Sequence, residues 1–255
     1  MKPRGKPMSD RPPIVVTGAS RGIGLELVRR LITQGHPVIG IAREAPDLPD
    51  PLFRFIRCDL SDRTAVSALA QDLAQLKPGG LINNAAVQTE GDPVTLSAEA
   101  IAAYVGTELD VNLATPLILG TALMPMIAEV PHGFICNVNS CLALAPKTSA
   151  PAYCAAKAGL SNATFALRER ARTWPGLLVS EVLLPLVDTD MTAGRGRRKI
   201  SAAQAAAGIL DGIARRRTAT RIGGARVLYA IWRLSPGLAR MVLRGAHPAG
   251  RRVGQ

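Results

Sequence analysis

Short apolar runs alternate with amphipathic segments along most of the chain. Runs of β-branched and other apolar residues predict six strands, at 14–16, 37–42, 53–58, 80–83, 133–138 and 177–184. Apolar residues at helical spacing predict helices at 24–34, 61–76, 111–127 and 153–172. Apolar strands separated by helices are typical of a parallel sheet that is covered on both faces.

This alternation predicts an α/β fold: a single-domain, Rossmann-like, doubly wound parallel sheet of about seven strands, with helices on both faces. A seventh strand is expected at 221–223. Because no linker divides the middle of the chain, we expect one domain at 12–224. It is flanked by a basic flexible arm at 1–11 and an amphipathic basic extension at 225–255.

The run from 111 to 128 is uncharged and has nearly the length of a membrane span. It also contains Asn112, Thr115 and Pro116, which suit a buried core helix better than a lipid-facing one. A buried amide needs partners, so Asn112 belongs either to a core hydrogen-bond network or to a proton path.

Charge is distributed unevenly along the chain. There are 31 Lys and Arg against 19 Asp and Glu, a net charge of +12. From Thr192 to Gln255 the chain has 14 basic residues and a single acid, Asp211, so this segment carries +13 and residues 1–191 carry −1. The segment suits a phosphate-bearing ligand, a membrane surface or nucleic acid; the alternative is a solvated arginine-rich surface.

The cysteines predict no disulfide framework and no metal site. Cys58, Cys136, Cys141 and Cys154 form neither a Cys-x-x-Cys pair nor a zinc-ligand spacing. Reduced thiols fit a cytoplasmic protein best.

The first predicted strand runs directly into a glycine-rich turn, Thr17-Gly18-Ala19-Ser20-Arg21-Gly22-Ile23-Gly24. Gly18 suits a tight turn, Gly22 lets the backbone approach a diphosphate, and Gly24 lets the helix pack close to the strand. The helix N-terminus then faces the anion. The alternative is a glycine-rich turn that binds nothing.

The end of the second strand discriminates between the two nicotinamide cofactors. An NAD site usually has an acid there to hold the ribose 2′-hydroxyl. Here the strand ends at Arg43, and Arg21 adds a second cation in the glycine loop. Two guanidinium groups can bind a 2′-phosphate, so we favour NADP(H). Glu44 follows directly and keeps NAD(H) possible, with Arg43 then a surface arginine.

Three further residues suggest acid–base chemistry. Tyr153 and Lys157 lie four apart on one helix face, and an ammonium group beside a phenol favours the phenolate. Such a pair can act as general acid or base, although the same spacing is common on helix surfaces. Ser140 ends the fifth strand, where its hydroxyl either contacts a substrate oxygen or serves as a turn residue.

Taken together and in order, these motifs resemble the short-chain dehydrogenase/reductase family over residues 12–192. The resemblance rests on the glycine loop 17–24, Asp59, Asn83-Asn84-Ala85-Ala86, Asn112, Ser140, Tyr153 with Lys157, and Pro185 with Thr189. Two positions depart from the family pattern: Ala86 and Leu186 each replace a usual glycine, and Leu186 is expected to narrow the nicotinamide end.

The resemblance implies roles for the catalytic residues Asn112, Ser140, Tyr153 and Lys157. Tyr153 would protonate a carbonyl oxygen in reduction, or take the hydroxyl proton in oxidation, and Ser140 would orient that oxygen. Lys157 would hold the nicotinamide ribose and lower the pKa of Tyr153, and Asn112 would support a water relay. The implied cofactor residues are Gly18, Ser20, Arg21, Gly22, Ile23, Gly24, Arg43, Asp59, Leu60, Asn83, Ala85, Tyr153, Lys157, Pro185 and Thr189.

The segment after the family motifs is specific to this chain. The resemblance implies a substrate lid at about 190–213, which includes a basic loop at 194–199 and a helix beginning after Ser201. Beyond it, 225–245 is amphipathic and arginine-rich, and Ser235-Pro236 should split it into two short helices. Three interpretations compete: packing over the active site or a partner subunit, binding at a membrane interface, and nucleic-acid binding, which is the least favoured.

The sequence therefore predicts an NADPH-dependent oxidoreductase that interconverts a carbonyl and an alcohol on a partly apolar small molecule or acyl-type metabolite. The alternative is a non-catalytic NADP-binding sensor or scaffold whose basic tail docks a membrane or a partner. A homo-oligomer, dimer or tetramer, is expected through the helices near 111 and 153. The expected location is cytoplasmic, with peripheral membrane contact through 225–255 as a further possibility.

Overall fold

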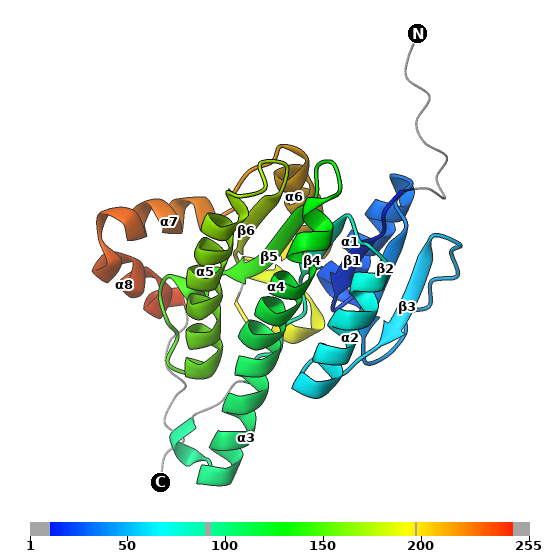
Figure 1. Cartoon of the computed structure of the whole chain (residues 1–255). Helices are drawn as coiled ribbons and strands as arrows, with labels where there is room; N and C mark the ends of the chain where they lie inside the picture. The colour runs from blue at the N-terminus through cyan, green and yellow to red at the C-terminus, as the bar shows by residue number, and fades with distance from the viewer. Residues whose placement is uncertain (1–10, 90–92, 197, 247–255) are drawn as a thin grey trace.

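The computed structural model describes residues 11–89, 93–196 and 198–246. Its centre is a parallel sheet of seven strands in the order β3-β2-β1-β4-β5-β6-β9 (Figure 1). The strands are β1 Ile14–Thr17, β2 Val38–Ala42, β3 Phe53–Arg57, β4 Gly80–Asn83, β5 Phe134–Ser140, β6 Leu178–Leu184 and β9 Ala219–Arg221. The predicted doubly wound sheet is confirmed, with the last strand two residues earlier than expected.

Helices cover both faces of the sheet. They are α1 Gly22–Thr33, α2 Arg63–Gln75, α3 Ala98–Leu109, α4 Thr115–Ala128, α5 Pro151–Ala171, α6 Ala202–Ala214, α7 Ala225–Leu234 and α8 Pro236–Ala246. One core cluster joins the sheet to α2, α4 and α5, which face the viewer in Figure 1. A second cluster joins the opposite face to α1 and α6.

The helix before residue 111 was not predicted. α3 continues into α4 through a π-turn, Asp110–Ala114, so the helical segment begins at 98 instead of 111. Glu108 is the only buried residue of α3, so no apolar stripe marks this helix in the sequence. The segment 98–128 is long and apolar enough to cross a membrane. However, α4 buries Leu119, Leu123 and Ile127 completely in the core, which confirms the expected core helix.

A second, two-stranded sheet was also not predicted. β7, Val187–Asp188, pairs in parallel with β8, Ile200–Ser201, and so closes the loop between them. Ser201 then caps α6 in a reciprocal capping box with Gln204, as its position predicted. Because α6 packs into the core against α1, the part of the predicted lid that borders open space is the loop 189–199.

The C-terminal extension forms two helices that meet at Ser235-Pro236, as predicted. Ser235 has an extended backbone, and its hydroxyl accepts a hydrogen bond from the Leu238 N–H at 3.3 Å. The inner side of the pair is apolar: Ala225, Leu228 and Ala239 pack with Cys141 and Leu183. The extension therefore packs beside the carboxyl ends of β5 and β6.

Candidate active site

A single large cavity of about 1140 Å³ lies at the carboxyl ends of the parallel strands. Parallel α/β sheets bind their ligands at this edge. One end is lined by the glycine loop and by the residues that follow β2 and β3, and the other end by α7 and α8. Most of the predicted site residues border it: Gly18, Ser20, Arg21, Gly22, Ile23, Gly24, Arg43, Asp59, Leu60, Ala85, Ser140, Tyr153, Lys157, Pro185 and Thr189.

The glycine loop forms a tight cradle. Gly18 and Gly22 have left-handed backbones, with φ of 68° and 56°. A Cβ on Gly24 would lie 1.9 Å from the carbonyl oxygen of Gly18, so the start of α1 is in direct backbone contact with the turn. The Thr17 hydroxyl accepts hydrogen bonds from the N–H groups of Asn84 and Ala85, both at 3.0 Å, and thereby joins this turn to the end of β4.

The N-terminus of α1 suits an anion. Arg21 occupies the N-cap position with an extended backbone and makes no side-chain capping bond, and the first turn holds no acid. The first amide groups of a helix need acceptors, and here they border the cavity. A cradle closed to any Cβ beside these amides fits the diphosphate of a dinucleotide.

The far side of this end carries the residues that discriminate between cofactors. Arg43 lines the cavity together with Glu44. The Asp59 carboxylate accepts hydrogen bonds from the Ser61 N–H and hydroxyl, at 3.0 and 2.7 Å, and these bonds, with the nearby charge of Arg43, lower the pKa of Asp59. Arg21 pairs with Asp190 at 3.4 Å, with side chains 70% and 75% exposed. An exposed pair of this kind is weak and can exchange for a bound phosphate.

The predicted catalytic residues converge on the middle of the cavity. Ser140 ends β5, while Tyr153 and Lys157 lie in the first two turns of α5. The Lys157 ammonium lies 5.8 Å from the centre of the Tyr153 ring and donates a hydrogen bond to the Val138 carbonyl at 3.1 Å. The Ser140 hydroxyl bonds the phenol and lowers its pKa. Both Tyr153 and Lys157 are buried.

Burial dominates the electrostatics of this group. It raises the pKa of Tyr153 to about 12 and lowers the pKa of Lys157 to about 8. We expected Lys157 to lower the pKa of Tyr153, but in this structure desolvation outweighs that effect. The phenol is therefore held in its protonated form, which suits it to donate a proton. The charge of Glu181, behind Lys157, partly restores the ammonium form.

Asn112 lies in the π-turn and is fully buried. Its amide bridges to the loop after β4: the Val87 N–H donates to Oδ1 at 3.2 Å, and Nδ2 donates to the Val87 carbonyl at 2.8 Å. π-Turns are frequent at functional sites because they shift the hydrogen-bond register of a helix. The structure thus gives Asn112 a hydrogen-bond network, and its part in a proton path stays a prediction.

Asn83 departs from its predicted place. It is buried, and its amide donates to the Asn137 side chain at 2.8 Å and to the Pro116 carbonyl at 3.3 Å instead of bordering the cavity. The neighbouring Asn84 borders the cavity and donates to the Thr17 carbonyl at 3.0 Å. In a strand, successive side chains point to opposite faces, so a shift of one residue exchanges the inner and outer positions.

Two buried acids near the site were missed. Glu108 accepts a hydrogen bond from the Thr89 N–H and lies beside the start of α5, where Ala150 supplies no side-chain cap. Burial raises the pKa of Glu108, and hydrogen bonds from Thr89 and the Tyr153 backbone partly offset the rise. Glu181 accepts from Asn139 at 2.8 Å. Neither acid stands in a recognisable motif, so only the folded chain places them behind the catalytic residues.

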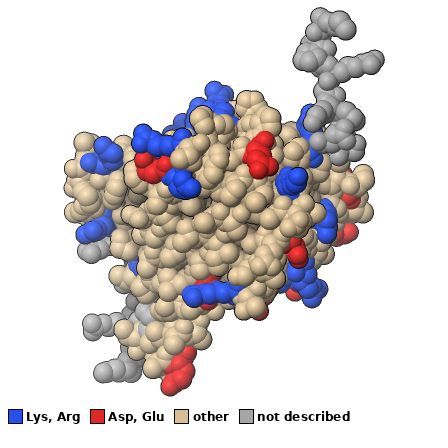
Figure 2. All heavy atoms as spheres, in the orientation of Figure 1, with Lys and Arg blue, Asp and Glu red and all other residues tan. Residues whose placement is uncertain are grey.

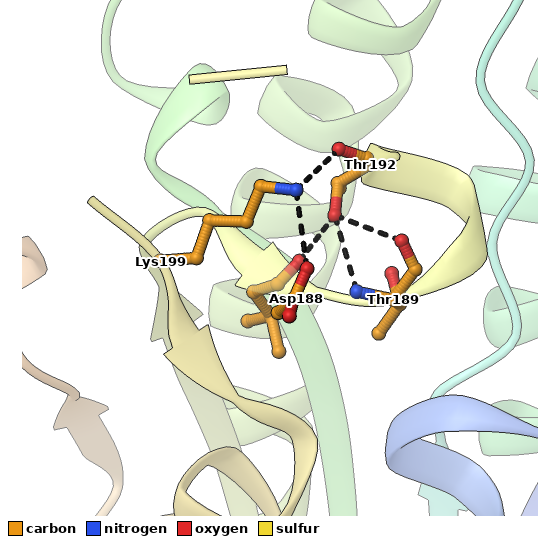
Figure 3. Close-up of polar contacts among 5 residues, drawn as sticks. Asp188, Thr189, Thr192 and Lys199 are labelled. Atoms are coloured by element: carbon orange, nitrogen blue, oxygen red, sulfur yellow. Dashed lines mark hydrogen bonds and ion pairs between the residues drawn. The ribbon is translucent and has the colours of Figure 1, made fainter. Parts of the chain in front are cut away.

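The loop after β7 is pinned at its base (Figure 3). Lys199 binds Asp188 at 3.1 Å and donates to the Thr192 carbonyl at 2.7 Å. The Thr192 hydroxyl accepts from the Thr189 N–H at 3.2 Å and donates to the Thr189 and Val187 carbonyls. These bonds fix Thr189 opposite Gly22, where an added Cβ would lie 3.2 Å from the threonine methyl.

The end of the cavity away from the glycine loop is apolar. Leu186, one of the two departures from the family pattern, lies so close to Gly196 that a Cβ there would approach its side chain to 2.5 Å. The remaining walls come from several segments: Leu142, Met191, Leu228, Val242 and Leu243. The last three belong to α7 and α8, so the C-terminal helices form part of this wall.

Comparisons with known proteins agree with this site. The short chain dehydrogenase family matches residues 13–199. The uncharacterized oxidoreductase DltE of Bacillus subtilis (strain 168) is 32% identical over 213 residues, which cover 78% of this chain and 83% of that protein. A Burkholderia cenocepacia short chain dehydrogenase, solved in complex with NADP, superposes with a TM-score of 0.79 at 24% identity and covers 92% of this chain and 96% of its own. A 4-hydroxyisoleucine dehydrogenase complexed with NADH has a TM-score of 0.74 at 23% identity and covers 84% and 98%. The chain belongs to the short chain dehydrogenase family, a family of NAD(P)-dependent oxidoreductases.

Proposed function

We propose that the protein is an NADP(H)-dependent oxidoreductase that interconverts a carbonyl and an alcohol on a partly apolar small molecule. The observation that carries this proposal is the convergence of Ser140, Tyr153 and Lys157 on one cavity whose other end fits a dinucleotide. NADP(H) is favoured over NAD(H) because Arg43 and Arg21 border the place where a 2′-phosphate would lie. The NADP complex of the Burkholderia relative supports the same choice, and the NADH complex of the other relative keeps NAD(H) as the second possibility.

The chain's residues would act as follows. The chemistry that a bound nicotinamide supplies is transfer of a hydride to or from a carbon atom. Ser140 orients the substrate oxygen by hydrogen bonding. Tyr153 donates its phenolic proton to that oxygen in reduction and takes the hydroxyl proton in oxidation. Lys157 holds the nicotinamide ribose and supplies a positive charge that stabilises the phenolate after the proton has left. Asn112 holds the loop after β4 and supports reprotonation.

The raised pKa of Tyr153 favours the reductive direction at neutral pH, because the residue begins the reaction as an acid. The apolar walls at Leu142, Met191 and Leu228 favour an apolar group next to the carbonyl. This convergence of three acid–base groups also argues against the sensor alternative, which needs none of them.

We also propose a cytoplasmic homo-oligomer. The four cysteines are free and buried, as expected for a reducing compartment. α4 and α5 expose Leu117 and Phe165, and Figure 2 shows few charged side chains on this face. A weakly charged face with exposed apolar residues suits an interface between subunits.

The test of the function is Tyr153→Phe, which removes only the phenolic oxygen. We expect turnover of ketones with NADPH to fall by about 10²- to 10⁴-fold, the usual contribution of a general acid. NADPH binding should change little, because the aromatic ring stays in place. Tyr104→Phe, on α3 and away from the cavity, is the matched control and should keep full activity. Turnover that survives in Tyr153→Phe would contradict the proposed mechanism.

A further inference from the structure

The two C-terminal helices have an outer face as well as the inner face that lines the cavity. Nine large apolar side chains are exposed in the described part of the chain, and five of them lie on α7 and α8. These are Val227 and Leu234 on α7, and Leu238, Met241 and Val242 on α8. Because soluble proteins bury or scatter such residues, this concentration within two short helices indicates a surface that binds something.

The exposed apolar residues share helix faces. Val227 and Leu234 lie seven apart on α7, which places them on the same side of the helix. Leu238, Met241 and Val242 have the i, i+3, i+4 spacing on α8. Leu234 is 89% exposed and Met241 is 66% exposed, so these are protruding side chains, not the rim of a packed core. Both helices are therefore amphipathic twice over, with one apolar side inward and a second outward.

The charges next to this outer face are all positive. α7 and α8 contain Arg226, Arg233 and Arg240 among their exposed residues and no acid. Figure 2 shows the same at the α7–α8 lobe, where the charged side chains in view are Lys or Arg. Exposed apolar residues flanked by arginines are the composition of helices that lie in the interface of an anionic bilayer.

A second copy of the chain is a poorer occupant of this face. A two-fold symmetric interface brings the same patch of both subunits together. Arg226, Arg233 and Arg240 would then meet their own copies with no acid of α7 or α8 between them, and like charges at an interface oppose association. An anionic lipid surface accepts the same arginines without that repulsion.

We propose that α7 and α8 dock the protein on an anionic membrane surface through Val227, Leu234, Leu238, Met241 and Val242. Val242 is both 46% exposed and part of the cavity wall, so the docked face meets the apolar end of the cavity. Docking would bring that end to the lipid surface, where an apolar substrate concentrates. This last consequence rests on the proposed function, whereas the docking itself does not.

The experiment is sedimentation of the full-length protein with vesicles of phosphatidylcholine alone and of phosphatidylcholine mixed with phosphatidylglycerol. It needs no substrate, so its outcome is independent of the proposed activity. We expect binding to the mixed vesicles, weak binding to the neutral ones, and loss of binding at high salt. Absence of binding to the mixed vesicles at low salt would overturn the proposal.

Two double variants separate the apolar and the charged contributions. Leu234→Ser with Met241→Ser should weaken vesicle binding by about tenfold or more, because two apolar side chains no longer enter the interface. Its matched control is Leu117→Ser with Phe165→Ser, which removes exposed apolar residues from α4 and α5. Arg233→Gln with Arg240→Gln should weaken binding to the mixed vesicles by about fivefold for each charge lost. Its control is Arg54→Gln with Arg57→Gln, on the edge strand β3.

Unchanged vesicle binding in the α7–α8 variants would overturn the proposal. So would a change of oligomeric state in Leu234→Ser with Met241→Ser, measured by sedimentation velocity, combined with no vesicle binding by the wild type, since the occupant would then be a second copy. Circular dichroism and the thermal midpoint should match the wild type in every variant, because the substituted residues are exposed.

Discussion

The two ends of the cavity are built in different ways. The cofactor end is made of backbone: a turn with two left-handed glycines, an uncapped helix N-terminus and the amides at the end of β4. The substrate end is made of apolar side chains from η4 Cys141–Ala143, the loop after β7 and the helices α7 and α8. One end relies on few allowed backbone conformations, and the other on which segments happen to meet. The first is therefore suited to one constant ligand, and the second can change its walls without disturbing the first.

The largest effect that could break this comparison is expected at Gly24. In Gly24→Ala the new Cβ would lie 1.9 Å from the Gly18 carbonyl oxygen, so the turn or the helix must move. We expect loss of detectable NADPH binding and a destabilisation of about 1–3 kcal/mol, measured by cofactor titration and denaturant unfolding. Gly106→Ala is the control: its Cβ meets nothing within 4 Å, and an alanine in α3 should slightly stabilise the protein. Normal NADPH binding by Gly24→Ala would show that the cradle is not the cofactor site.

Lys157 tests the electrostatics where the two ends meet. Its pKa is lowered by burial to about 8 from 10.5, so between these values the unfolded chain binds more protons than the folded protein. Stability should therefore rise with pH across that window, below which the buried charge is a constant penalty. We expect Lys157→Met to be more stable than the wild type at neutral pH by up to about 3 kcal/mol, with the difference shrinking towards pH 10.5. Urea unfolding at several pH values measures this, and Lys77→Met, at an exposed position, should show no such trend.

Arg43 sharpens the account of cofactor choice. Removing its charge in Arg43→Gln should raise the Kd for NADPH by about 10- to 100-fold, because a hydrogen bond to a charged phosphate contributes about 1.5–3 kcal/mol. The Kd for NADH, which lacks the 2′-phosphate, should change less than twofold. Arg54→Gln, at an exposed position outside the cavity, controls for the loss of net charge. Equal losses for both cofactors would remove Arg43 from the phosphate site and leave Arg21 as the candidate.

The smallest effect is expected at the substrate end. Leu243→Ala trims one apolar wall, so KM for bulky apolar ketones should rise several-fold, by about one buried side chain's share of the hydrophobic contribution. The Kd for NADPH should stay unchanged, because Leu243 is at the opposite end of the cavity. Leu238→Ala, on the exposed side of the same helix, is the matched control. A change in NADPH affinity would mean that the two ends are not independent.

The same difference explains what the sequence could predict. The strand, the glycine loop and α1 follow each other within a few residues, so their geometry is a local property and was predicted. Ser140, Tyr153 and Lys157 were also found, because each stands at a fixed place relative to a strand end or helix start. α3 was missed because it buries Glu108 instead of an apolar stripe, and β7 and β8 because two residues each give no pattern.

Other features depend on contacts between distant segments. The position of Leu228 and Val242 in the cavity wall follows from how α7 and α8 pack, which no local motif encodes. The direction of the pKa shifts of Tyr153 and Lys157 depends on burial, which outweighed the attraction that their spacing suggested. Asn83 and Asn84 exchanged roles because a prediction from motif order is uncertain by one residue, and one residue is enough to reverse a strand's inner and outer sides.

The measurement that tests the central claim most directly is a titration of the purified protein with NADPH and with NADH, followed by nicotinamide fluorescence. The account predicts that both bind in the one cavity and that NADPH binds at least about tenfold more tightly, as expected for a charge-assisted contact to the 2′-phosphate. Absence of binding by either cofactor, or an affinity for NADH equal to that for NADPH, would contradict it.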